Sequence, residues 1–177
     1  MIDGPTSVYV ADSVNNRIRK ITLHGIAPPS VISGTPTNPT GSPQTFTFTA
    51  RDPDGAANLY RTYFLINDNT QIPQNTCHGF YDRQAHTLYL YNDALNTLFG
   101  PLTPGAAGTL QNSQWTLHGA TSAIVSAADT DLVLNLGFSL NGSFAAAARK
   151  IYLWARDKDG NDTGWVQTGT WGTPVPP

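Results

Sequence analysis

The feature of this sequence that most restricts its fold is an alternation of apolar and polar side chains in short runs. In residues 44–50, Phe46, Phe48 and Ala50 fall on one face of an extended chain and threonines on the other, which is typical of a half-buried strand. Similar runs, mostly separated by Gly, Asn, Asp or Pro, predict strands at residues 59–66, 79–81, 87–91, 114–117, 123–126, 132–140, 151–156 and 165–171. Many short strands at this spacing predict an all-β, two-sheet sandwich.

Composition supports the all-β prediction and argues against several classes of function. Only 12% of the 177 residues are charged, glutamate is absent, and 16 glycines and 13 prolines disfavour long helices. The alanine-rich run 144–149 favours a helix, but it is too short to shape the architecture. A net charge of −2 offers no basic field for nucleic acid, and no apolar run is long enough for membrane insertion. Residues 1–5 also lack the residue order of a signal peptide.

Residues 8–21, with the sequence VYVADSVNNRIRKI, form a strand–turn–strand pattern that resembles one piece of an NHL-type β-propeller repeat. Half a blade cannot fold alone, because each repeat buries its apolar face against its neighbours. The pattern must therefore pack against the rest of this chain, a second copy of it, or a propeller. Proline-rich residues 28–43 follow, so we expect a strand segment at 1–27 and a sandwich domain at 28–177. The residues expected to add to a neighbouring sheet are Val8, Tyr9, Val10, Ile18, Ile21 and Leu23.

The rest of the chain resembles the immunoglobulin-like or fibronectin-type-III-like modules of large secreted bacterial proteins. The segments that carry this resemblance are residues 44–55, 81–83, 88–90, 108–114 and 151–157. The resemblance implies an extracellular or cell-surface location and a role in adhesion, spacing or recognition, with no reaction. It also implies a second cysteine near Trp115 that would pair with one like Cys77, and this sequence has no such residue.

Two acidic turns follow apolar-alternating strands: residues 50–55 read ARDPDG and residues 155–160 read ARDKDG. If these strands are the B and F strands of an immunoglobulin-like sandwich, both turns lie at one pole. Calcium takes six to eight oxygen ligands, and carboxylates on two neighbouring loops can supply several of them. The alternative is ordinary turn chemistry with surface ion pairs. The candidate ligands are Asp52, Asp54, Asp157, Asp159 and Asp162; no other cofactor is expected.

Tyrosine and tryptophan side chains are the second candidate site. The run 151–156 alternates so that Ile151, Leu153 and Ala155 point inward, and the run 87–91 sends its leucines inward in the same way. The aromatic residues between them then face outward, and Trp165 and Trp171 share the parity of Gln167. Such a face can stack on sugars, contact a protein, or pack within the chain. It comprises Tyr89, Tyr91, Tyr152, Trp154, Trp165 and Trp171.

Catalysis finds little support in the sequence. Cys77 and His78 are neighbours in a predicted strand, so their side chains point to opposite faces and cannot pair as nucleophile and base. We expect a buried Cys77 thiol in preference to an intermolecular disulfide. The sequence therefore predicts a non-catalytic structural or adhesive module that contacts itself or a neighbouring domain. The most specific version of this prediction is that the chain grows into filaments by strand addition. A carbohydrate-binding module and a passive spacer beside a propeller remain the alternatives.

Overall fold

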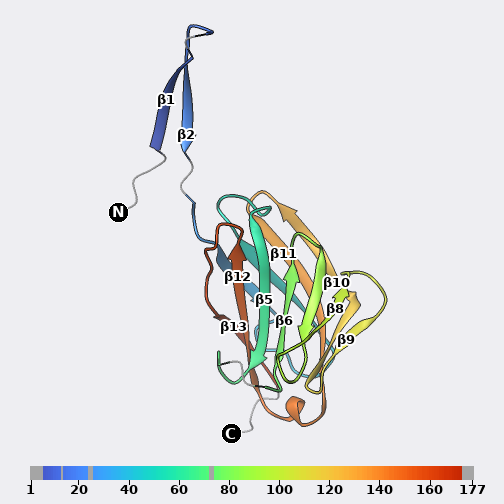
Figure 1. The fold of residues 1–177 in the computed structure, drawn as a ribbon. Helices are drawn as coiled ribbons and strands as arrows, with labels where there is room; N and C mark the ends of the chain where they lie inside the picture. The colour runs from blue at the N-terminus through green and yellow to red at the C-terminus, as the bar shows by residue number, and fades with distance from the viewer. Residues whose placement is uncertain (1–5, 13, 24–25, 72–73, 173–177) are drawn as a thin grey trace.

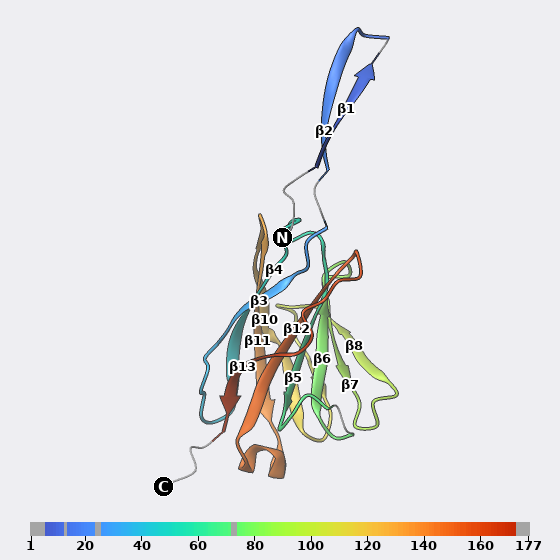
Figure 2. The ribbon, with the colours of Figure 1, turned by 90° about the vertical axis from the view of Figure 1, so that its left-hand side faces the viewer.

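The computed structural model describes residues 6–12, 14–23, 26–71 and 74–172, and it is built from antiparallel β-sheets (Figure 1). A hairpin pairs β1 (Thr6–Asp12) with β2 (Arg17–Leu23) and forms a two-stranded sheet by itself. The remaining strands form two sheets that enclose a common core (Figure 2). This architecture confirms the predicted all-β, two-sheet sandwich with an N-terminal hairpin.

The two sheets of the sandwich contain five and six strands. The order in the five-stranded sheet is β3 (Ser30–Thr35), β4 (Gln44–Arg51), β11 (Asp131–Leu140), β10 (Trp115–Ala128) and β9 (Thr109–Gln111). The order in the six-stranded sheet is β13 (Val166–Trp171), β12 (Arg149–Asp157), β5 (Leu59–Asn67), β6 (Cys77–Asp82), β7 (Thr87–Tyr91) and β8 (Leu98–Leu102). In the described part of the chain, no helix has the length and apolar character needed to cross a membrane.

Several elements differ from the sequence prediction for local reasons. The runs 114–117 and 123–126 belong to one strand, β10, because a bulge between His118 and Ala123 interrupts the alternation without ending the pairing with β11. The strands β3, β8 and β9 are not predicted from the sequence. β3 lies in the proline-rich stretch expected as a linker, and β8 contains Pro101, which an edge strand tolerates. The predicted helix at 144–149 is wrong, since residues 142–146 form a single 3-10 turn, η1 (Gly142–Ala146).

The core lies between the two sheets and is rich in aromatic rings. Phe46 and Phe48 of β4 are buried and stack with ring centroids 5.6 Å apart, while the threonines between them stay on the outer face, as the alternation predicts. Phe138 of β11 joins the sheets, because its ring lies 4.8 Å from Trp115 and 5.4 Å from Phe64 of β5 (centroid distances). Cys77 is fully buried in this core, which confirms the expected burial of its thiol.

Trp171 also belongs to the core, and its predicted place on the outer aromatic face is wrong. Its side chain is 1% exposed, its ring centroid lies 5.1 Å from that of Phe46, and its Nε1 donates a hydrogen bond to the carbonyl of Gly41 (2.8 Å). The cause is a bulge in β13, where Ile151 pairs with residue 169 and the next residue, Tyr152, pairs with residue 167. The extra residue reverses the faces of all later side chains in the strand.

Candidate binding surfaces

The hairpin β1–β2 stands beyond one end of the sandwich (Figures 1 and 2). Among the described residues, each of its strands pairs only with the other. The register places Tyr9 on the same face as Ile18, the cross-strand partner of residue 11, and places Val10 on the opposite face. These three side chains are 65%, 75% and 43% exposed, in that order. The hairpin therefore presents apolar side chains to solvent on both of its faces.

The other residues predicted for strand addition lie in the same paired strands. Val8 pairs with Ile21, and Leu23 pairs with the first residue of β1. Their side chains are outside the part of the structure that is described. At the turn of the hairpin, Val14 is 90% exposed.

The acidic loops after β4 and β12 meet at the end of the sandwich nearest the hairpin. Asn58 joins them, because its Nδ2 donates to Asp52 Oδ2 (3.2 Å) and to Asp159 Oδ2 (2.9 Å). Asp52 is fully buried, and this burial raises the pKa of its carboxyl group, with the negative charges of Asp157 and Asp54 adding to the effect. The structure thus brings the two predicted acidic turns together.

Internal hydrogen bonds occupy most of these carboxylates. Asp157 is 1% exposed and accepts bonds from the backbone and side-chain nitrogens of Asn161 (2.7 and 2.9 Å). Asp52 Oδ1 accepts from the backbone nitrogen of Asp54, and Asp162 Oδ1 accepts from that of Gly164. Over the residues that are described, no group of three or more His, Cys or Asp side chains is arranged to hold a metal ion. Calcium binding stays a prediction.

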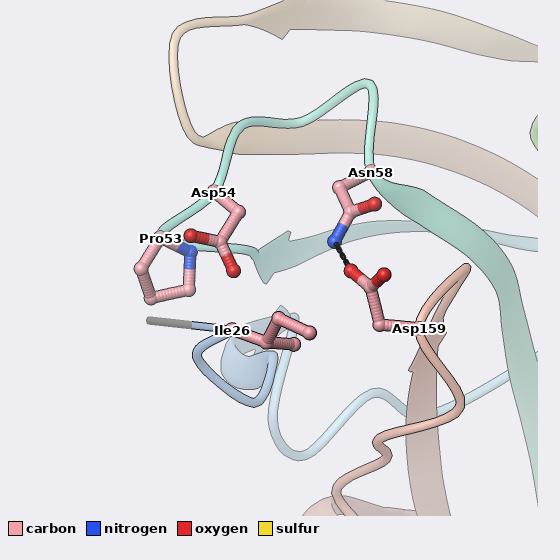
Figure 3. Close-up of a pocket in the computed structure, with 5 residues that line it drawn as sticks. All are labelled: Ile26, Pro53, Asp54, Asn58 and Asp159. Carbon is pink, nitrogen blue, oxygen red and sulfur yellow. Dashed lines mark hydrogen bonds between the residues drawn. The ribbon is translucent and has the colours of Figure 1, made fainter. Parts of the chain in front are cut away.

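A hollow of about 480 Å³ lies where the chain leaves the hairpin and reaches the acidic loops (Figure 3). It is lined by Ile26, Pro53, Asp54, Asn58 and Asp159. The backbone nitrogen of Ala27 donates to Asp54 Oδ2 (2.8 Å), so the acidic turn also anchors the end of the segment that leads from the hairpin into the sandwich.

Asn58→Ala is expected to lower the free energy of unfolding by roughly 1–2 kcal/mol, because it leaves Oδ2 of the buried Asp52 carboxylate without its side-chain donor. Urea denaturation monitored by tryptophan fluorescence measures the loss, and the exposed Asn38→Ala is the matched control. Repeating both titrations with calcium chloride or EDTA tests the predicted metal site. Equal stabilities for the two variants would show that the loops do not depend on Asn58.

The outer face of the six-stranded sheet carries two cross-strand rows of aromatic and apolar side chains. In the first row, which begins at Trp154, each residue is the cross-strand partner of the next. In the second row, which begins at Tyr152, this holds for the first three residues. The tyrosines and the tryptophan of β7 and β12 were predicted from the sequence. The β5 and β6 residues between them were not, although the same alternation in those strands indicates them. The first row is Trp154, Tyr63, Phe80 and Tyr89; the second is Tyr152, Leu65, His78 and Tyr91.

The rings of this face contact one another and differ in exposure. His78 stacks on Tyr91 with ring centroids 4.4 Å apart. Trp165 lies edge-on to both His78 (5.7 Å) and Trp154 (5.3 Å), again between centroids. Tyr152 is only 6% exposed between its cross-strand neighbours, so its predicted exposure is wrong although its face is right. The partly exposed members are Tyr63, Tyr89, Tyr91, Trp154 and Trp165.

The five-stranded sheet carries a histidine–serine pair that the sequence did not predict. His118 Nε2 of β10 lies 2.7 Å from Ser139 Oγ of β11, and the two residues come from adjacent strands. Among the described residues, no carboxylate hydrogen-bonds to this imidazole. The pair therefore lacks the third group that orients a catalytic base.

Comparison with known proteins gives no relative from which a role can be transferred. The surfaces described above must therefore be interpreted from their own chemistry. No family model, curated protein or solved structure matches the chain.

Proposed function

We propose that this protein is a non-catalytic extracellular module that makes a protein–protein contact through the hairpin β1–β2. The single observation that supports this most is the isolation of the hairpin: it pairs only with itself in the described structure and exposes Tyr9, Val10 and Ile18. An isolated two-stranded hairpin is marginally stable in water at best. A partner that covers both faces would supply the missing burial.

Strand addition is the mode of contact that fits this hairpin. In the described structure no further strand pairs with the outer edge of either β1 or β2, so both edges are open to pairing with the edge of another sheet. Apolar side chains on both faces of the hairpin are typical of strands that other elements cover on both sides, as happens inside a larger fold. The resemblance of residues 8–21 to an NHL repeat supports the same mode, since a blade is a small sheet packed between two others.

A second copy of the chain is the partner that charge favours. Residues 1–27 carry three basic side chains and two aspartates, whereas residues 28–177 carry seven basic side chains and ten aspartates. The hairpin segment of one copy therefore complements the sandwich of the next. A head-to-tail contact of this kind generates a filament when the rotation between successive copies does not close into a ring.

Ile18→Asp is expected to abolish self-association, because it places a charge among the apolar side chains that would be buried. Sedimentation velocity over a range of concentrations and negative-stain electron microscopy measure the assemblies. Val125→Asp, which changes a side chain on β10 that is 57% exposed, is the control and should assemble like the unmodified chain. If the unmodified chain stays monomeric at every concentration, self-assembly is refuted and a spacer beside another domain becomes the better account.

A further inference from the structure

Two side chains on the outer face of the six-stranded sheet bury polar atoms that lack hydrogen bonds. In the described part of the chain, neither ring nitrogen of His78 has a hydrogen-bond partner, and the Nε1 of Trp154 has none either. His78 is 8% exposed, so water reaches little of it. An unpaired buried polar group costs about 1–3 kcal/mol, and native structures contain few of them. Two such groups on one surface indicate that something else completes their hydrogen bonds.

The surroundings of these atoms define what that partner would be. The rings of Tyr63, Tyr91 and Trp165 contact the His78 ring at centroid distances of 6.3, 4.4 and 5.7 Å. Arg61, a cation on this face, lies 4.5 Å above the Phe80 ring and is paired with an aspartate. Burial also lowers the pKa of His78 to about 4, so its imidazole is neutral at pH 7 and can both donate and accept a hydrogen bond. Neither His78 nor Trp154 therefore carries a formal charge that a ligand would neutralise.

A neutral sugar combines the properties that this surface requires. Its C–H groups form an apolar face that packs on aromatic rings, and its hydroxyl groups donate and accept hydrogen bonds. We propose that the outer aromatic face is a binding site for a neutral polysaccharide, in which the partly exposed rings stack on pyranose units and a sugar hydroxyl pairs with His78 or with the indole N–H of Trp154.

Trp165 is placed to control access to these atoms. It follows β12 on the connection to β13 and lies against both His78 and Trp154. The residue before it, Gly164, has φ of +61°, and the position of its absent side chain is open. Rotation of the Trp165 ring about this glycine would expose the sides of His78 and Trp154 that it contacts. This site is separate from the hairpin and does not depend on the function proposed above.

Native gel electrophoresis of the full chain through hydroxyethyl cellulose, laminarin, glucomannan and xylan tests the proposal. We expect at least one of these polymers to retard the protein, and His78→Phe to weaken that binding at least tenfold while keeping an aromatic ring at the site. Trp165→Ala should weaken binding to a similar extent. Val125→Ser, a change at an exposed position on the other sheet, should leave binding unchanged.

Unfolding measurements separate loss of binding from loss of structure. His78→Phe removes the unpaired nitrogens, so at pH 7 its urea midpoint should equal or exceed that of the unmodified protein. Loss of retardation in this folded variant would support the proposed site. Failure of all four polymers to retard the unmodified protein, or retardation of His78→Phe with the original affinity, would overturn it.

Discussion

Trp171→Ala is expected to lower the free energy of unfolding by about 3–5 kcal/mol, the usual cost of truncating a large aromatic side chain in a core. The Trp171 ring packs against Phe46, and its Nε1 donates a hydrogen bond to the carbonyl of Gly41, so its loss leaves a cavity and removes that hydrogen bond. The strand that carries it also holds the segment before β4, since the backbone nitrogen of Thr170 donates to the carbonyl of Thr37 (2.8 Å). Urea denaturation followed by circular dichroism measures the effect.

Trp165→Ala is the matched control, because this residue has the same chemistry and lies six positions earlier on the other face. Its ring is partly exposed and lies edge-on to His78 and Trp154, so its removal is expected to cost about 1 kcal/mol. If Trp171→Ala does not fold, Trp171→Phe retains most of the volume and reports the lost hydrogen bond together with a smaller loss of packing. A larger cost for Trp165→Ala than for Trp171→Ala would contradict the bulge in β13.

Acidification from pH 7 to pH 4 is expected to remove about 3 kcal/mol of stability through His78 alone. Burial lowers the pKa of this imidazole in the folded protein to about 4, against about 6.5 in the unfolded chain. Between these values the unfolded state binds a proton that the folded state does not, so stability falls as the pH falls through this window. Urea titrations at several pH values measure the slope.

The His78→Phe variant isolates this contribution, because phenylalanine has no proton to bind. Other groups shift in the same region: burial raises the pKa of Asp52, and the hydrogen bond from Arg51 lowers that of Asp131. Both groups are present in the variant, so their effects cancel in the difference. The unmodified protein should lose stability more steeply than the variant between pH 6.5 and 4. Parallel slopes would mean that His78 has a hydrogen-bond partner that keeps its pKa near the usual value.

Alternation in the sequence was sufficient to predict most strands and their buried faces. Phe46, Phe48, Leu88 and Leu90 lie in the core as expected, because a strand with one buried face must place alternate side chains inward. The same alternation failed for Trp171, since one extra residue in β13 reverses the faces without leaving a local sequence signal. It also overstated the exposure of Tyr152, whose burial depends on cross-strand neighbours from other parts of the chain.

The sequence by itself determined the all-β class, the hairpin and the proximity of the two acidic turns, because these follow from local periodicity, turn residues and strand direction. Only the tertiary structure decided which edges pair, where the bulges fall and which aromatic side chains become neighbours. Those outcomes depend on contacts between residues far apart in the chain. His78 illustrates the difference: nothing near it in sequence marks it, and its unpaired nitrogens arise only when the rings of three other strand regions close around it.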